Sequence, residues 1–304
     1  MKVIVSSASR SPLLKNFPLT LDLAPSATVA DVKAAIAAKA PKLSASRQKI
    51  SVVGDKKPLA DDSPISVTGT ELAVKDLGPQ VSWKTVFLVE YAGPLIIHPL
   101  VFHLPRLFYG NDVKHSNLQI FVYAFVVLHF LKRELETLFV HRFSHATMPL
   151  GNIFKNSAHY HLFSGLALAY DVYRPKYGAN SPYVHGTVRD SPEFLWVGAA
   201  VWLFAELSNL HTHLTLRNLR APGSRERKIP RGYGFTWVSV PNYFFETIAW
   251  LVICFMTNSI AAWVFTVIAV GQMGLWAVKK HQAYRKEFGT SYPRGRKAMI
   301  PFVF

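Results

Sequence analysis

Long apolar runs fill the sequence after Trp83, and they limit what the chain can fold into. A hydrocarbon layer about 30 Å thick is crossed by about 20 helical residues. Five or six segments are long enough, or nearly so. We therefore predict a multi-pass α-helical membrane bundle of about six transmembrane helices, at residues 83–103, 118–138, 158–173, 194–213, 243–257 and 259–278. The last two ranges are separated only at Asn258, which predicts a tight helical hairpin.

The first 78 residues are polar with short apolar stretches, unlike the rest of the chain. Thr28 is a good N-cap for a helix at Val29–Lys39, and short strands are expected around it at residues 1–5, 19–23, 49–53 and 71–75. This order resembles the ubiquitin-like α+β (β-grasp) fold, although any small α+β domain would fit it. The chain is thus predicted to hold two domains, at residues 1–78 and 79–304.

The net charge of +16 is concentrated at residues 217–231 and 279–297, each directly after an apolar run. Such placement is typical of cytosolic loops of membrane proteins and would also attract the phosphates of a dinucleotide. Six spans would then place both the N- and C-termini in the cytosol. No nucleic-acid motif accompanies the charge, so nucleic acid is not an expected partner. The single cysteine, Cys254, excludes an intrachain disulfide.

Ionisable residues inside the apolar runs are candidates for a functional site, because a charge at membrane depth costs several kcal/mol. Glu90 is one, although it could also lie at headgroup level. Another group follows steps of three and four along one predicted helical face: Glu206, Asn209, His213, Arg217 and Arg220. Arginine suits phosphate oxygens and asparagine suits an amide. Alternatively, the helix leaves the bilayer there and its arginines snorkel into water.

Tyr243, Glu246 and Trp250 also lie three and four residues apart, with Asn242 at the start of their run. A phenol can donate a proton to a carbon or stabilise an enolate oxygen, whereas a tyrosine in an aromatic belt needs no such role. Spacing alone leaves both interpretations open.

The twelve histidines do not predict a metal site. His141 and His145 form one HxxxH pair, but no HxxHH occurs, and histidines two apart on a helix diverge. No Gly-x-Gly-x-x-Gly motif is present either, so a bound dinucleotide would not be held by a Rossmann domain.

Five sequence stretches resemble the very-long-chain trans-2-enoyl-CoA reductases of the steroid 5α-reductase superfamily. They are EYAGPL at 90–95, KRELETLFVHRFS at 132–144, KIPRG at 228–232, PNY at 241–243 with Glu246, and RKAMIPF at 296–302. The resemblance runs from about Leu77 to the C-terminus, in order and with matching spacing.

The resemblance implies an NADPH-dependent oxidoreductase of the endoplasmic reticulum membrane. Its members reduce very-long-chain trans-2-enoyl-CoA to acyl-CoA in the last step of microsomal fatty-acid elongation, which implies a long-chain enoyl-CoA substrate, membrane lipid and other elongase components as partners. Tyr243 would then donate the proton to C2 or to the enolate oxygen, assisted by Glu90, with Gln80 and Lys132 in support. The NADPH ligands would be Asn209, His213, Arg217, Arg220, Asn242, Glu246, His281 and Tyr284.

Two departures from the steroid reductases favour the enoyl-CoA branch. In the steroid reductases, the position that resembles Phe130 holds a tyrosine, which helps hold the steroid carbonyl. Those enzymes also have a membrane helix where this chain has its polar N-terminal domain. A further departure, Trp276 in place of an arginine, leaves the phosphate contacts there open. The alternatives are a 3-oxo-steroid 5α-reductase, a non-catalytic scaffold that recruits elongation partners, and a methyltransferase that uses S-adenosylmethionine.

Overall fold

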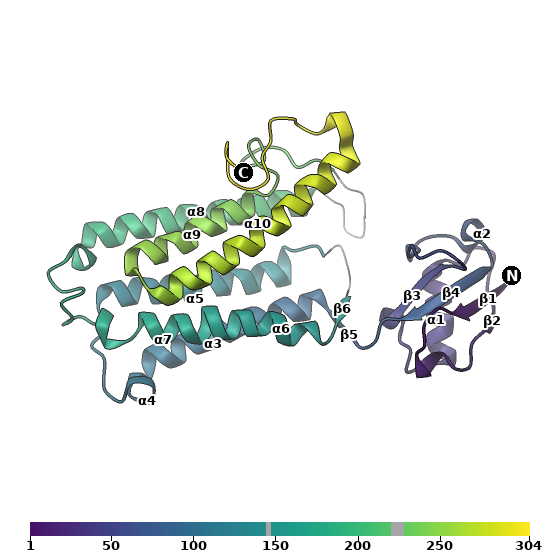
Figure 1. The fold of residues 1–304 in the computed structure, drawn as a ribbon, viewed down its shortest axis with the longest axis horizontal. Coiled ribbons are helices and arrows are strands. Elements are labelled where there is room, and N and C mark those ends of the chain that lie inside the picture. Colours follow the sequence, from purple (N-terminus) through teal and green to yellow (C-terminus); the bar gives the residue numbers. More distant parts are fainter. Residues whose placement is uncertain (144–146, 220–227) are drawn as a thin grey trace. The chain divides into compact units, whose positions relative to one another are not determined.

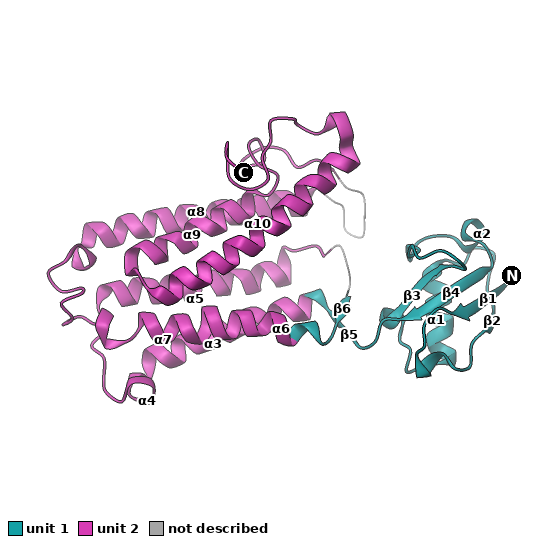
Figure 2. Ribbon diagram, viewed as in Figure 1, with its two compact units in different colours: residues 1–83, 145–153 teal, residues 84–144, 154–304 magenta. Residues whose placement is uncertain are grey.

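The computed structural model describes residues 1–143, 147–219 and 228–304, and the chain divides into two units. Met1–Trp83 together with His145–Ile153 form the first unit, and Lys84–Ser144 together with Phe154–Phe304 form the second (Figure 2). The first unit thus reaches beyond the predicted boundary at residue 78 and takes in a short segment from later in the chain.

A four-stranded sheet forms most of the first unit, with strand order β2-β1-β4-β3 (Figure 1). The central strands β1 (Lys2–Ser7) and β4 (Glu71–Asp76) are parallel, whereas β2 (Leu19–Asp22) and β3 (Gln48–Val52) pair antiparallel at the two edges. Side chains alternate along each strand, so Val3 and Val5 of β1 are buried while their neighbours face out.

Helix α1 (Val29–Lys39) packs on this sheet through Val29, Val32 and Ile36, which share the core with β1. At its N-terminus Asp31 accepts hydrogen bonds from the Thr28 backbone N–H at 2.8 Å and from its hydroxyl at 2.9 Å. The predicted N-cap is therefore confirmed. The short helices η1 (Pro12–Leu14), η2 (Ala45–Arg47) and α2 (Ile65–Thr68) complete the unit.

Asp76 at the end of β4 forms hydrogen bonds with residues of three different loops. Its carboxylate accepts hydrogen bonds from the Ser11 hydroxyl at 2.6 Å, from Arg47 at 2.9 and 3.0 Å, and from the Gly78 backbone at 2.9 Å. Burial raises the pKa of the Asp76 carboxyl, but these donors, led by Arg47, outweigh it and lower the pKa to about 2.

A separate two-stranded antiparallel sheet, formed by β5 (Gln80–Ser82) and β6 (Thr147–Pro149), also belongs to the first unit. Its strands lie more than sixty residues apart in the sequence. Short strands without an apolar pattern give no sequence signal, so this pairing was not predicted.

The second unit is a bundle of long helices (Figure 1). Its elements are α3 (Trp83–His103), α4 (Pro105–Tyr109), α5 (Asn117–Phe139), α6 (Asn152–Ala158), the π-helix η3 (His159–Ala167), α7 (Leu168–Val172), η4 (Pro175–Tyr177), η5 (Val188–Asp190), α8 (Pro192–Asn218), α9 (Pro241–Thr257), α10 (Ile260–Phe288) and η6 (Gly289–Ser291).

The six predicted spans coincide with helical segments, except that Tyr173 and Ser259 lie just outside them. By length and composition, two of the described helices, at Trp83–His103 and Ile260–Ser291, are long and apolar enough to cross a membrane. α5 and α8 are as long but contain charged residues, which lower their apolarity. A count of six spans therefore stays a prediction. The tight hairpin is confirmed, because α9 ends at Thr257, Asn258 has a left-handed backbone with φ of 49°, and α10 begins at Ile260.

Close helix packing forms the core of the second unit. α8 and α9 lie against each other at Gly198, where a Cβ atom would come within 2.5 Å of the Met256 sulfur. Trp202 of α8 stacks on Phe125 of α5, with ring centroids 4.7 Å apart and planes inclined by 7°. Asp171 accepts a hydrogen bond of 2.5 Å from the Ser259 hydroxyl, which fixes the start of α10 against α7.

We expect Asp76→Asn to destabilise the first unit by about 1–2 kcal/mol near pH 7, because charge-assisted hydrogen bonds are lost. The folded-state pKa of Asp76 lies below the value of about 3.9 for an unfolded chain. The wild-type advantage is therefore present above about pH 4 and is lost as the pH falls toward 2. Amide hydrogen exchange in β1 and β4 of both full-length proteins measures this. Equal protection of the two proteins at pH 7 would contradict it.

Candidate functional site

A cavity of about 400 Å³ opens in the second unit at the ends of α3, α5, α8, α9 and α10. α5 contributes Arg133, α8 contributes His213 and Arg217, and α9 contributes Asn242 and Tyr243. The remaining polar or aromatic lining comes from α3, from the segments after α5 and before α9, and from α10: Phe87, His141, Arg142, Phe143, Lys228, Ser239, Trp276, Lys280 and Tyr284.

The cavity is strongly basic. Among the described residues, five cationic side chains and no carboxylate line it: Arg133, Arg142, Arg217, Lys228 and Lys280. The guanidinium of Arg217 forms neither a hydrogen bond nor an ion pair with any described residue. Such a surface attracts anions, and an arginine without a protein partner is available for a phosphate.

Tyr243 stands in the first turn of α9, which begins at Pro241. Its ring lines the cavity and lies 6.4 Å from the ring of Trp276. Within the described parts of the chain its hydroxyl makes no hydrogen bond. A phenol that faces a cavity without a partner can donate to a bound molecule.

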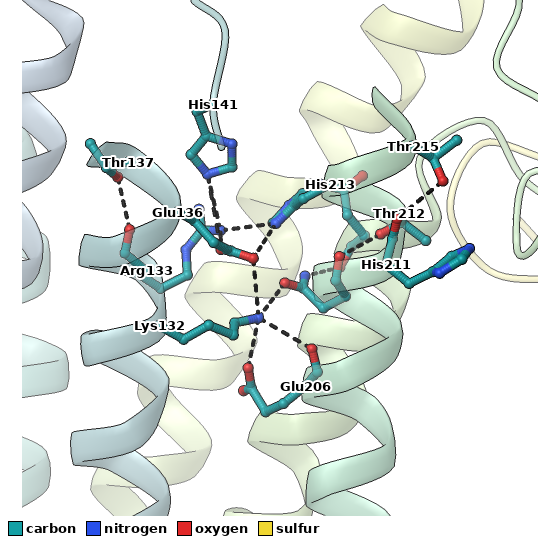
Figure 3. A network of polar contacts seen from close by, with 12 residues as sticks. Lys132, Arg133, Glu136, Thr137, His141, Glu206, His211, Thr212, His213 and Thr215 are labelled. Atoms are coloured by element: carbon teal, nitrogen blue, oxygen red, sulfur yellow. Dashed lines mark hydrogen bonds and ion pairs between the residues drawn. The ribbon is translucent and has the colours of Figure 1, made fainter. Parts of the chain in front are cut away.

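Behind the cavity wall, a polar network joins α5 to α8 (Figure 3). Lys132 of α5 lies 2.8 Å from a carboxylate oxygen of Glu206 and donates to the Asn209 side chain at 2.5 Å. The other oxygen of Glu206 lies 2.7 Å from His129. The Asn209 amide N–H₂ donates to the backbone carbonyl of Asn242 at 2.8 Å. Asn209 is therefore engaged on both sides, and it fixes the start of α9.

Arg133 is the second cation of this network. It lies 2.7 Å from Glu136 and donates to the Tyr91 hydroxyl at 2.9 Å. The other Glu136 oxygen lies 2.9 Å from His213. Glu136 is 1% exposed, so its charge depends on these partners. Arg133 also lines the cavity, which links the network to its surface.

Glu136, His141 and His213 offer ligand atoms within 4.8 Å of one another, which is the spacing of a metal site. Arg133 lies among them, 2.7 Å from Glu136, 3.4 Å from His213 and 3.5 Å from His141. Burial, together with the charge of Arg133, lowers the pKa of His141 to about 3. A guanidinium charge in this position opposes a metal cation.

Of the other residues predicted for the site, some line the cavity and others do not. Glu90 of α3 is 2% exposed and one of its oxygens has no hydrogen-bond partner in the described chain. Glu246, one turn after Tyr243, forms no ion pair with a described residue. Neither lines the cavity. Tyr284 does, and His281 reaches it through Ser239, whose hydroxyl lies 2.6 Å from the imidazole.

Two predicted residues lie elsewhere. Gln80 belongs to the first unit, where its side chain donates to the Leu77 carbonyl at 3.0 Å. Arg220 lies outside the described residues.

Sequence reasoning missed Arg133, Glu136 and Tyr91. A signal was present, because Arg133 and Glu136 are ionisable residues in an apolar run and lie three apart, which suits an ion pair on one helix. It also missed that the C-terminal segment supports the residues just before Asn242 through backbone hydrogen bonds. The Ser239 N–H donates to the carbonyl of Lys297 at 2.8 Å and the Val240 N–H to that of Ala298 at 3.1 Å, next to Asn242.

Comparison with known proteins places this site in a family. The model of the family described as 3-oxo-5-alpha-steroid 4-dehydrogenase matches residues 146–304. An enoyl reductase of Schizosaccharomyces pombe is 51% identical over 77% of this chain and 76% of its own length. A very-long-chain enoyl-CoA reductase of Dictyostelium discoideum is 44% identical over 76% of this chain and 74% of its own.

A third relative, from Caenorhabditis elegans and also named as a very-long-chain enoyl-CoA reductase, is 40% identical over 95% of both chains. That alignment includes the first unit as well as the second. The family is one of membrane proteins. The chain therefore belongs to the 3-oxo-5-alpha-steroid 4-dehydrogenase family, in its branch of very-long-chain enoyl-CoA reductases.

Proposed function

We propose that this chain reduces very-long-chain trans-2-enoyl-CoA to acyl-CoA with NADPH. The observation that carries the proposal is the hydroxyl of Tyr243, which has no partner in the described chain and faces a basic cavity of about 400 Å³. The names of the relatives give the substrate class. In the reaction enoyl-CoA, NADPH and a proton give acyl-CoA and NADP⁺.

The residues around the cavity fit the dinucleotide. Arg217 and the other lining cations suit its phosphates, and Asn242 and Tyr284 offer hydrogen-bonding groups in the same wall. His281 supports that wall through Ser239. When bound there, NADPH supplies the hydride. Asn209 serves this site from behind, by holding Asn242, and Lys132 holds Asn209 in turn.

The protein's own task is to place the substrate and to manage charge and protons. Reduction of an alkene conjugated to a thioester develops negative charge on the carbonyl oxygen, so a preorganised donor there lowers the barrier. Tyr243 is our candidate for the proton donor. Glu90, buried with an unpartnered oxygen, assists it.

The proposed location fits this chemistry. A long acyl chain is held between apolar helices, while the basic cavity holds the phosphates of NADPH and CoA. We place the enzyme in the endoplasmic reticulum membrane with six spans and both termini cytosolic, where it completes the fatty-acid elongation cycle beside other elongase components. The first unit is proposed to be ubiquitin-like, which its strand order β2-β1-β4-β3 with a central parallel pair supports.

A steroid 5α-reductase is the competing enzyme, because the matching family model has that description. Phe130 disfavours it. The ring of Phe130 is fully buried beside Tyr91 and Trp250, and it has no hydroxyl to hold a steroid ketone.

The proposal is tested by NADPH oxidation with trans-2-hexadecenoyl-CoA in purified full-length protein. We expect turnover by the wild type and a fall in kcat of about 100-fold or more in Tyr243→Phe, because general acid catalysis contributes roughly 10²–10⁴-fold. Glu90→Gln should fall as well. Glu193→Gln, on the exposed start of α8, is the control and should keep full activity. No turnover by the wild type would favour a scaffold, and unchanged turnover by Tyr243→Phe would remove its role.

Cofactor binding is tested separately through Arg217→Gln. Loss of a charged contact to phosphate should weaken NADPH binding about tenfold, measured by quenching of tryptophan fluorescence without substrate. The control is Arg106→Gln, whose exposed guanidinium pairs with Asp112. Equal NADPH affinity in both variants would show that Arg217 does not touch the cofactor, and binding of S-adenosylmethionine instead would indicate a methyltransferase.

A further inference from the structure

The π-helix η3 (His159–Ala167) is an unusual element that the proposed function leaves unexplained. π-helical turns are rare and occur frequently at functional sites, because the extra residue per turn redirects side chains. η3 is fixed on α3 through His161, which lies 2.8 Å from the carbonyl oxygen of Val89. Its ring occupies the space beside Gly93, where a Cβ would come within 1.9 Å of it.

This geometry packs the partly buried Tyr160 against the core of the second unit. Its ring meets Tyr91 edge to face, with centroids 5.3 Å apart and planes at 90°, and meets Phe130 at 6.4 Å and 86°. Tyr91 in turn accepts a hydrogen bond from Arg133, which lines the cavity. Tyr160 is therefore connected through Tyr91 to Arg133, a residue of the cavity wall.

The hydroxyl of Tyr160 makes no hydrogen bond within the described residues. Tyr160 is only partly buried, so its hydroxyl is not enclosed by protein and is available to a bound molecule.

We propose that Tyr160 is a further catalytic residue, whose hydroxyl donates a hydrogen bond to the thioester carbonyl oxygen of the enoyl-CoA. This rests on the proposed function. Hydride addition at C3 moves the π electrons onto that oxygen, and the donor stabilises the negative charge. Tyr243 is then left to deliver the proton to C2, after which the carbonyl re-forms and acyl-CoA and NADP⁺ result.

The neighbours of Tyr160 are less suited to this task. The Tyr91 hydroxyl accepts a hydrogen bond from Arg133, and Tyr91 is only 2% exposed, so it is enclosed by protein. Phe130 has no hydroxyl. Glu90 donates only when it is protonated, whereas a phenol is a donor at neutral pH.

Kinetics of Tyr160→Phe with trans-2-hexadecenoyl-CoA test the proposal first. Removal of one oxyanion donor lowers kcat by about 100-fold, while the KM for NADPH stays within about twofold. Tyr170→Phe is the matched control, because Tyr170 is exposed on the following helix α7 and no hydrogen bond of its hydroxyl is present in the described chain. It should retain the wild-type kcat. If Tyr160→Phe also retains it while the wild type turns over, the role of Tyr160 is wrong and the proposed function stands.

A spectroscopic measurement does not depend on turnover. Saturated hexadecanoyl-CoA labelled with ¹³C at the thioester carbonyl is bound to each protein and followed by difference infrared spectroscopy. A hydrogen-bonded carbonyl absorbs at lower frequency, so Tyr160→Phe should move the band to higher frequency and Tyr170→Phe should leave it in place. An identical band in both variants would overturn the contact.

The replacement of Tyr160 by 3-fluorotyrosine covers the case in which Tyr160→Phe does not fold. The added fluorine makes the phenol more acidic and changes its shape little. If the neutral phenol is the donor, the alkaline limb of the pH dependence of kcat should move to lower pH. An unmoved limb contradicts the proposal, and a wild type without any turnover contradicts both this inference and the proposed function.

Discussion

The pairing of charges between α5 and α8 is the interaction on which the second unit depends. Lys132 and Arg133 are largely buried beside Glu206 and Glu136, which are 4% and 1% exposed. Each of these ions alone would be costly to remove from water, and loss of one partner leaves the other uncompensated. The pairs therefore hold the two helices in a single register, because a shift of either helix would separate opposite charges.

The same network also positions residues of the cavity wall. Asn209 receives a hydrogen bond from Lys132 and donates one to the carbonyl of Asn242, so the first turn of α9 is placed by the same network. Tyr243 belongs to that turn. Arg133 connects the network to Tyr91 and, through ring contacts, to Tyr160. The groups proposed to act on substrate are thus positioned by charges that need not touch it.

The sequence predicted the parts of the fold that follow from periodicity or from composition. The helical ranges and the hairpin at Asn258 are examples, because apolar runs and their interruptions are local features. The β5–β6 pairing depends on contacts between distant segments. The π-helix was read only as a helical range, because an extra residue per turn has no compositional signal.

The candidate site was predicted in part for a similar reason. The polar face of α8 was read correctly as a stripe, but spacing does not tell which of its members face the cavity. His213 and Arg217 line it, whereas Glu206 and Asn209 are turned to α5. The partners of those side chains lie about 77 positions away in the sequence, so only the folded chain reveals them.

The backbone pairing of residues 297–298 with residues 238–240 has a consequence for how damage to the gene would act. A stop codon at position 297 would remove only the last eight residues and would leave every described helix of the bundle intact. It would nevertheless remove the strand-like support beside Asn242 and Tyr243. The same consideration affects purification, because a bulky tag near these residues would press on the wall of the cavity, whereas the other terminus belongs to a separate unit.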